Sequence, residues 1–402
     1  MEQSARAAVG GELTELAREL DERDPLSGVR AEFELDPEIA YLDGNSLGPP
    51  PRTVAPRMAE VVREQWAGRL IRSWPEGWWD APVRVGGRIA RLVGAAQGQV
   101  VACDSTSVNL FKVMVAALRL NPERNEILLD GNTFPTDGYI ADSVARMMGA
   151  TVRRVPVPEM GAAAGPRTAA ALINHVDYLS GRLHDMPGLT AELRAAGALG
   201  VWDLCHSVGA VPVELDESEV DLAVGCTYKF LNGGPGSPAF VYVARRWQDR
   251  FDQPLSGWGG HRDPFAMAPS YTAGEGIDRA RSGTPDILSL LALDAALDVW
   301  DGVELSSVRA KGLALGDFFL RCLDELLPGT EVLTPRDSAR GHQISIAWPD
   351  AETAMTTLIR RGVIGDFRPP GVLRFGLAPL HTRYSDVLRA VCALQELAGN
   401  GR

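Results

Sequence analysis

Short apolar runs recur along residues 100–240 of the chain, separated by amphipathic segments. Five of these runs predict buried strands, at residues 100–102, 126–130, 172–178, 199–204 and 222–224. Two of the segments between them predict helices, at residues 108–120 and 189–196. Strands that alternate with helices form a mostly parallel, doubly wound sheet, and ligands bind at the carboxyl ends of its strands. The expected fold class is therefore α/β.

The pattern changes on either side of this region. A helix is predicted up to Glu22, because leucines recur there at helical spacing and Pro25 follows. Near the C-terminus, helices at 287–300 and 307–327 and strands at 342–347 and 372–377 predict a smaller α+β unit. We expect three parts: an N-terminal helix and arm over 1–45 that packs with the small domain, a large cofactor-binding domain over 46–300, and the small domain over 301–402.

Composition and charge exclude several classes of protein. With 52 acidic and 40 basic residues the net charge is −12, which argues against nucleic acid and anionic membranes as partners. No apolar run approaches the length of a membrane span, and the N-terminus has no signal-peptide or transit-peptide pattern. The five cysteines lack paired spacing, so neither disulfides nor a zinc site is expected. We expect a cytoplasmic globular enzyme that binds a small molecule and no metal.

A lysine at the end of one predicted strand is the first candidate for chemistry. The run 222–224 leads to Tyr228 and Lys229, and a Gly-rich turn follows at 233–236. Burying an ammonium group is costly, so its position makes sense if the amine is a nucleophile in a pocket, as in a Schiff base. Taken alone, a lysine that simply faces solvent is the commoner explanation.

Polar groups also mark two other places in the predicted sheet. Asp203 lies at the end of one apolar run, and His206 follows it by three residues. A buried aspartate is costly unless a cation or hydrogen-bond donors pair with it. Thr106 and Ser107 lie at a helix start, where hydroxyl groups either cap the helix or help free N–H groups to bind an anion.

Three further stretches offer contacts for a substrate. The turn with Asn45 and Ser46 could meet a carboxylate and is equally well a plain loop. Residues 66–79 hold four tryptophans, and Pro and Gly among them predict a loop whose rings could grip a flat substrate. Arg374, inside an apolar strand, either pairs with a core carboxylate or binds a substrate carboxylate.

Together these residues meet the needs of one cofactor, pyridoxal 5'-phosphate. This chemistry requires a Schiff-base lysine, an aspartate that keeps the ring nitrogen protonated, a phosphate site and an arginine for the substrate. All four occur in order along an alternating strand–helix chain, which is strong evidence for such an enzyme.

Motifs spread over nearly the whole chain carry a family resemblance. They are GNSLG at 44–48, RSW at 72–74, TFPTD at 133–137, WDLCHSVG at 202–209, CTYKFLNGGPGSPAFVYV at 226–243, LSGWGGH at 255–261, SGTP at 282–285 and LRFGLAPL at 373–380. In these motifs the chain resembles the kynureninases, within the aspartate-aminotransferase-like (fold type I) pyridoxal phosphate enzymes. The resemblance implies a homodimer that hydrolyses L-kynurenine to anthranilate and L-alanine, with an active site shared across the interface.

The resemblance also implies a role for each matching cofactor residue. Lys229 would be the Schiff-base lysine, Asp203 would meet the pyridine nitrogen with His206 beside it, and Phe134 would stack on the ring. Thr106, Ser107 and the Tyr228 hydroxyl would bind the phosphate. The other cofactor positions are Pro135, Thr136, Asp137, Asn174 (where the family has Ser or Thr), Trp258 and Thr284, the last two reaching across the dimer interface.

For the substrate, the resemblance places the carboxylate at Arg374 and the Asn45–Ser46 turn. Trp74 and Thr284 stand where relatives that favour 3-hydroxykynurenine have His and Asn, so a preference for unhydroxylated kynurenine is implied. Tyr228, beside both phosphate and lysine, is the expected proton relay. A related enzyme that acts on a substituted kynurenine is the alternative.

Functions of other kinds fit the residues less well. A cysteine desulfurase needs a reactive cysteine on a mobile loop late in the chain, whereas Cys322 and Cys392 fall in predicted helices. A non-catalytic pyridoxal phosphate regulator would be favoured by loss of Lys229 or by an added DNA-binding domain. A dinucleotide-binding oxidoreductase would rest on the NGGPG turn alone, which lacks the G-x-G-x-x-G spacing before a helix.

Overall fold

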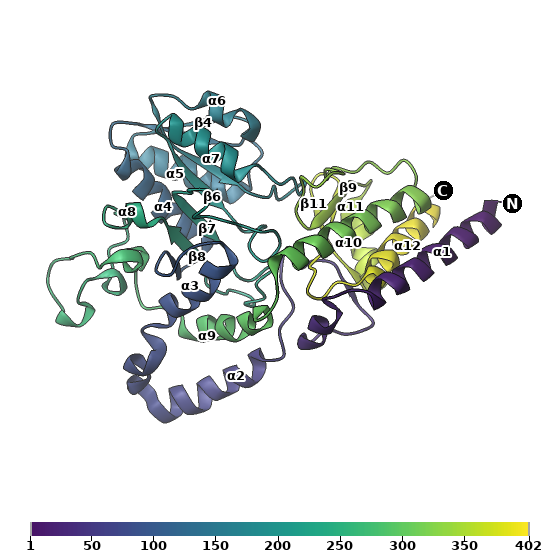
Figure 1. Cartoon of the computed structure of the whole chain (residues 1–402), viewed down its shortest axis with the longest axis horizontal. Helices are drawn as coiled ribbons and strands as arrows, with labels where there is room; N and C mark the ends of the chain where they lie inside the picture. The colour runs from purple at the N-terminus through teal and green to yellow at the C-terminus, as the bar shows by residue number, and fades with distance from the viewer. Residues whose placement is uncertain (1, 401–402) are drawn as a thin grey trace.

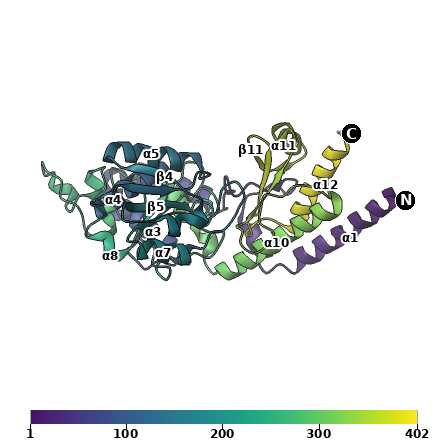
Figure 2. The same ribbon diagram turned by 90° about the horizontal axis from the view of Figure 1, so that it is seen from above.

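The structure of the chain is a computed structural model that describes residues 2–400. Figure 1 shows a layered α/β part with a central sheet, and beside it a smaller part formed by the chain from α10 (Leu305–Leu326) onward together with α1 (Glu2–Glu22). The turned view in Figure 2 shows the same two parts side by side, with α1 on the side of the smaller part that is away from the central sheet.

The central sheet has seven strands in the order β2-β8-β7-β6-β5-β3-β4. Every neighbouring pair is parallel except the two that involve β8, which runs antiparallel to β2 and β7. The mostly parallel α/β sheet is therefore as predicted. Its strands are β2 (Val100–Ala102), β3 (Glu126–Leu129), β4 (Thr151–Arg154), β5 (Thr168–Asn174), β6 (Leu199–Asp203), β7 (Leu222–Gly225) and β8 (Phe240–Val243).

Helices cover both faces of this sheet, because its strands are apolar on both sides. In β8, Phe240 and Tyr242 join the core on one face, while Val241 and Val243 join the core on the other. The first core also contains residues of α3 (Ala81–Leu92), α7 (Met186–Ala195) and α9 (Ile287–Ala296). The second contains residues of α4 (Thr106–Leu120) and α5 (Pro135–Met148).

The smaller part has its own apolar core and its own sheet. Strands β9 (Gln343–Ala347), β12 (Val372–Gly376) and β11 (Asp366–Arg368) pair antiparallel, with β12 in the middle. Its helices are α10 (Leu305–Leu326), α11 (Ala351–Arg360) and α12 (Tyr384–Asn400). Leu13 and Ala17 of α1 belong to the same core, and β1 (Ala40–Tyr41) pairs with β10 (Val363–Ile364). The domain boundaries at residues 45 and 300 stay predictions.

Short helical elements lie between the longer helices and strands. They are η1 (Ser27–Glu32), α2 (Val54–Glu60), η2 (Val61–Arg69), η3 (Leu70–Ser73), η4 (Trp74–Trp78), η5 (Val157–Glu159), α6 (Met160–Ala163), α8 (Arg245–Gln248), η6 (Trp258–Gly260), η7 (Pro264–Ala266), η8 (Gly276–Ala280) and η9 (Leu297–Trp300). No helix within residues 2–400 is long and apolar enough to cross a membrane.

Two sequence-based expectations about elements were wrong. The region 66–79 is wound into helical turns (η2–η4) and is not an open loop, because Pro75 occupies a first-turn position that needs no N–H, and Gly77 absorbs the kink with φ 135°. The strand predicted at 172–178 is β5, which begins at Thr168 and ends at Asn174. Tyr178 therefore lies in the loop beyond the strand.

Candidate active site

A cavity of about 240 Å³ opens where the carboxyl ends of β5, β6 and β7 meet the start of α4. Parallel strands bring their ends to one edge of the sheet, so residues distant in sequence converge there. Its lining residues are Thr106, Ser107, Phe134, Thr136, Asp137, Asn174, Val176, Tyr178, Asp203, Cys205, His206, Tyr228 and Lys229. Ten of these thirteen residues are cofactor positions predicted from the sequence.

The Lys229 amine contacts a histidine inside this cavity. Lys229 Nζ lies 2.9 Å from His206 Nε2. Burial, with the charges of Lys229 and Arg374, lowers the pKa of His206 well below its usual value, so the imidazole is neutral. Lysine can only donate, so Nε2 accepts and the proton of the ring sits on Nδ1. That nitrogen is buried and has no partner among the described residues.

Two buried carboxylates share the cavity with Lys229. Burial and the charge of Asp203 raise the pKa of Asp137 well above its usual value. Asn174 Nδ2 donates to Asp137 Oδ2 at 2.7 Å, and the Cys205 N–H donates to Asp203 Oδ1 at 2.6 Å. Adjacent buried carboxylates are stabilised by a cation, and Lys229 is the one cation lining this cavity. The carboxylate of Asp203 is an acceptor that fits a ligand with a protonated ring nitrogen.

Asn174 organises the Phe134 turn. Its Oδ1 accepts hydrogen bonds from Thr133 Oγ1 (2.8 Å) and from the Phe134 N–H (3.2 Å). Its amide nitrogen donates to Asp137, so both polar atoms of the Asn174 side chain are hydrogen-bonded within the protein. The Phe134 ring is exposed and packs edge-to-face on Tyr178, with ring centroids 5.3 Å apart.

The start of α4 presents two hydroxyl groups that do not cap the helix, and one of them, Thr106 Oγ1, contacts Cys205 Sγ at 3.8 Å. Ser105 is the N-cap, and its side chain accepts from the Val108 N–H. Thr106 and Ser107 are therefore not needed as caps, and both line the cavity at the positive end of a 15-residue helix. This geometry suits a phosphate group. Tyr228 lies beside them, and the neighbouring Cys226 sulfur together with burial raises the pKa of its phenol.

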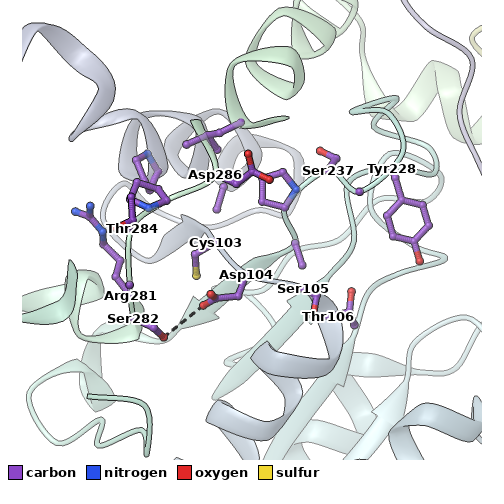
Figure 3. A pocket seen from close by; sticks show the side chains of 18 residues that line it. Cys103, Asp104, Ser105, Thr106, Tyr228, Ser237, Arg281, Ser282, Thr284 and Asp286 are labelled. Atoms are coloured by element: carbon purple, nitrogen blue, oxygen red, sulfur yellow. Dashed lines mark hydrogen bonds between the residues drawn. The ribbon is translucent and has the colours of Figure 1, made fainter. Parts of the chain in front are cut away.

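A second cavity, of about 440 Å³, adjoins the first through Thr106 and Tyr228 (Figure 3). Thr284 lines this second cavity and not the first. Trp258 Nε1 donates to Thr284 Oγ1 at 3.2 Å, and the Trp258 ring lies 6.4 Å from the ring of Trp74. Trp74, Trp258 and Thr284 thus form one group outside the Lys229 cavity of their own chain.

The predicted substrate-carboxylate residues form a third group, on the sheet of the smaller part. Arg374 is buried in β12, and its Nε and Nη2 donate to Oδ1 (2.9 Å) and Oδ2 (2.5 Å) of Asp366. Its Nη2 also donates to Ser46 Oγ, and its Nη1 to the Tyr178 carbonyl. Asn45 Nδ2 donates to the Gln343 side chain at 3.3 Å. The structure thus pairs Arg374 with the carboxylate of Asp366, and its contact with a substrate stays a prediction.

Sequence reasoning missed several residues of these groups. Cys205, Val176 and Tyr178 line the Lys229 cavity without having been singled out, and Asp366 holds Arg374. Pro135, which was predicted, lines a neighbouring cavity and not this one. Cys205 lies between two predicted residues, Asp203 and His206, and that spacing was the available signal.

Comparisons with known proteins agree on one family and one fold. Residues 308–394 match the family model for the kynureninase C-terminal domain. A kynureninase of Deinococcus radiodurans is 48% identical over 394 residues, which cover 94% of this chain and 96% of the relative. A kynureninase of Burkholderia pseudomallei is 46% identical, with 95% of each chain covered.

Solved structures share the fold at low identity. The apo cysteine desulfurase of Thermococcus onnurineus superposes with a TM-score of 0.82 at 19% identity, covering 94% of this chain and 99% of that one. A variant of C-DES with glycine linked covalently to its PLP cofactor superposes with a TM-score of 0.81 at 16% identity, covering 91% and 99%. The expected aminotransferase-like fold is confirmed.

Proposed function

The chain belongs to the kynureninase family, and from this premise we propose that it hydrolyses L-kynurenine to anthranilate and L-alanine. It is an enzyme of that family, a hydrolase of C–C bonds, and pyridoxal 5'-phosphate is its cofactor. The observation that carries the proposed reaction is the Lys229 cavity, where an amine, a neutral histidine and two carboxylates meet at the strand ends.

We assign the cofactor to the groups that fit it. Asp203 would face the ring nitrogen, the start of α4 with Thr106 and Ser107 would receive the phosphate, and Lys229 would hold the cofactor covalently. When bound, pyridoxal phosphate acts as an electron sink for negative charge that develops on the substrate. The free Nδ1–H of His206 is a donor available to the cofactor or the substrate.

Proton transfer in this proposal is carried by Lys229 and Tyr228. Because His206 is neutral, its Nε2 accepts a hydrogen bond from Lys229 Nζ and orients the amine, which acts as a base in its neutral form. The raised pKa of Tyr228 keeps its phenol protonated, so we assign it as a proton donor and not as a base. Lys229 Nζ would remove the α-proton of the substrate and return it one step later.

The expected ring preference rests on the Trp74 group. In relatives that favour 3-hydroxykynurenine, His and Asn would bond the extra hydroxyl. Here the Thr284 hydroxyl already accepts from Trp258, and Trp74 offers an indole at the other position. We propose a higher kcat/KM for L-kynurenine than for 3-hydroxykynurenine, and side-by-side kinetics with both substrates test it. The reverse order would refute this assignment.

We also propose a cytoplasmic homodimer in which the Trp74–Trp258–Thr284 group completes the partner's site. This would explain why the group lies outside the Lys229 cavity of its own chain. Apolar side chains near it are exposed, as expected of a surface that a second copy covers: Trp66, Ile71, Phe265 and Met267. Mixing Lys229→Ala with Trp258→Ala chains should restore about a quarter of wild-type activity, because hybrid dimers contain one intact site. No restoration would refute the shared site.

The reaction itself is tested with the holoenzyme. Cofactor absorbance should be present, and L-kynurenine should release anthranilate, detected by its fluorescence, with L-alanine in equal amount. Cofactor absorbance without anthranilate would leave the family and fold intact and refute the substrate. Desulfurase activity is not expected, because Cys322 and Cys392 lie in α10 and α12 and not on a loop.

A further inference from the structure

Two cysteines lie side by side at the carboxyl end of the central sheet. Asp203 of β6 is paired with Val224 of β7, so the residues two positions further on, Cys205 and Cys226, are opposite one another in the same register. The Leu204 N–H still donates to the Val224 carbonyl at 2.8 Å, so the two strands remain paired up to this point. The two cysteines are 21 residues apart in the sequence, and the strand register brings them together.

The two cysteines are in direct contact. Cys205 Sγ accepts a hydrogen bond from the Cys226 N–H at 3.2 Å, and the Cys226 thiol donates to the Cys205 carbonyl at 3.6 Å. Both are free thiols. Neighbouring strands lie about 4.8 Å apart, and the Cα atoms of a disulfide lie about 4.4–6.8 Å apart. The backbone therefore already has the spacing that a bond between the two sulfur atoms requires.

One of the two thiols is open to the Lys229 cavity. Cys205 lines this cavity and is 8% exposed, whereas Cys226 does not line it and is 1% exposed. Cys205 Sγ also lies 3.8 Å from Thr106 Oγ1, at the proposed phosphate site. The cavity volume of about 240 Å³ is several times the volume of about 30 Å³ that a water molecule occupies. A small oxidant such as hydrogen peroxide therefore reaches Cys205 through the cavity.

The inner thiol is suited to react with an oxidised Cys205. Burial raises the pKa of Cys226, but the Cys205 thiol and the positive charge of Lys229 outweigh it, so the pKa is lowered overall. The Cys226 sulfur and burial raise the pKa of Cys205. Because the thiolate is the nucleophilic form of cysteine, Cys226 is the better nucleophile of the two once Cys205 has been oxidised.

We propose that Cys205 and Cys226 form a reversible oxidation site, which peroxide converts to a disulfide when the cavity is empty and which bound pyridoxal phosphate protects. In the first step the Cys205 thiol and hydrogen peroxide give a sulfenic acid and water. In the second step the Cys226 sulfur attacks the Cys205 sulfur, the S–S bond forms, the S–O bond breaks, and hydroxide leaves with the Cys226 proton as a second water. The two sulfur atoms lose the two electrons that the peroxide O–O bond gains. The protection rests on the proposed position of the cofactor in this cavity.

Mass spectrometry after trypsin digestion measures the state of the pair. Both cysteines lie in the tryptic peptide 195–229, and the other three cysteines lie in other peptides. Enzyme freed of cofactor and treated with hydrogen peroxide should give this peptide lighter by two hydrogen atoms and inert to iodoacetamide, and dithiothreitol should restore both thiols. With pyridoxal phosphate at about 100 times its Kd, about 1% of the chains are free of cofactor, so disulfide formation should be about a hundredfold slower.

Two variants separate the role of the pair from general oxidation of thiols. Cys226→Ser removes the second thiol, so peroxide should carry Cys205 on to a sulfinic acid that dithiothreitol does not reduce. Cys392→Ser removes a cysteine of α12 in the smaller part, and its peptide 195–229 should form the disulfide as in wild type.

The inference is overturned if the cofactor-free enzyme keeps both thiols under peroxide, or if dithiothreitol restores oxidised Cys226→Ser enzyme as fully as wild type. Equal rates of disulfide formation with and without pyridoxal phosphate would overturn the protection. Failure of the proposed function would look different, because the holoenzyme would then release no anthranilate from L-kynurenine, whatever the state of the two thiols.

Discussion

A buried lysine behind the proposed phosphate site allows the sharpest prediction about stability. Lys112 lies in the middle of α4 with its side chain 0% exposed. Its Nζ donates to Asp104 Oδ2 at 2.6 Å and to the Ala280 carbonyl at 2.7 Å, with Cys103 Sγ at 3.5 Å. One ammonium group thus ties the β2–α4 turn to the end of η8. Asp104 itself has φ 51°, which an ordinary side chain rarely adopts.

Lys112→Met removes the ammonium group and leaves three acceptors without this donor. Breaking a buried ion pair costs about 3–5 kcal/mol. Because Asp104 is 27% exposed and can regain water, we expect the lower end of that range. With an unfolding entropy of about 2.1 cal/mol/K per residue, a loss of about 3 kcal/mol lowers the melting temperature of this chain by roughly 3–4 °C.

The same change should weaken cofactor binding, because the turn that Lys112 holds carries Thr106 and Ser107. Thermal unfolding of the apoenzyme gives the first effect, and titration with pyridoxal phosphate, followed by absorbance, gives the second. The double variant Lys112→Met, Asp104→Asn should lose less than the sum of the single variants, since the stranded carboxylate is gone. A Lys112→Met apoenzyme that melts within about 1 °C of wild type would refute the argument.

Other expectations follow from the pKa shifts and from Tyr228. Tyr228→Phe should slow anthranilate release while leaving cofactor absorbance in place, and unchanged turnover would remove Tyr228 as the proton donor. Burial and Asp366 raise the pKa of Asp43 to about 7, so its ionisation near that pH adds negative charge beside Arg374, the carboxylate contact that the family resemblance implies, and should raise KM for L-kynurenine. A KM that does not rise between pH 6 and 8 would contradict this. Burial holds the pKa of three histidines near 3, so below about pH 6.5 the unfolded chain binds protons that the folded chain does not. The free energy of unfolding should therefore fall by up to about 1.4 kcal/mol per pH unit for each of these histidines. Urea unfolding at several pH values measures it, and flat stability from pH 6.5 to 5 would contradict the neutral state of these histidines: His175, His342 and His381.

The cofactor half of the site could be predicted because its positions depend on local pattern and sheet topology. Strands buried on both faces appear in the sequence as unbroken apolar runs, and parallel order brings their ends together. Asp203 ends β6 and Lys229 follows the end of β7 by four residues, so their proximity followed once the alternation of strands and helices was recognised. The direction of β8 could not be predicted, because an apolar strand has the same pattern in either orientation.

The polar residues that were not predicted differ in how clearly the surrounding sequence indicates their contacts. Lys112 interrupts a long apolar helix, and a charge in that position predicts a buried partner, although not which one. Asp366, which holds Arg374, lies in a three-residue strand, too short to show alternation. Its pairing with Arg374 comes from the register with β12, which sequence pattern alone does not determine.

The substrate half of the site depends on contacts between segments that are far apart in sequence. The loop after β5 is joined to the small sheet by several hydrogen bonds: the Gly341 N–H to the Gly181 carbonyl, Ser345 Oγ to the Leu179 carbonyl, and Arg374 to the Tyr178 carbonyl. Tyr178 in turn packs on Phe134 at the mouth of the Lys229 cavity. The same short loop therefore contacts Arg374 and lines the Lys229 cavity, so its geometry sets the distance between the Arg374 guanidinium and the Lys229 amine. A substitution that displaces this loop should change substrate binding without moving Asp203, Thr106 and Ser107, which we propose for the cofactor, because Asp203 ends β6 and the other two begin α4.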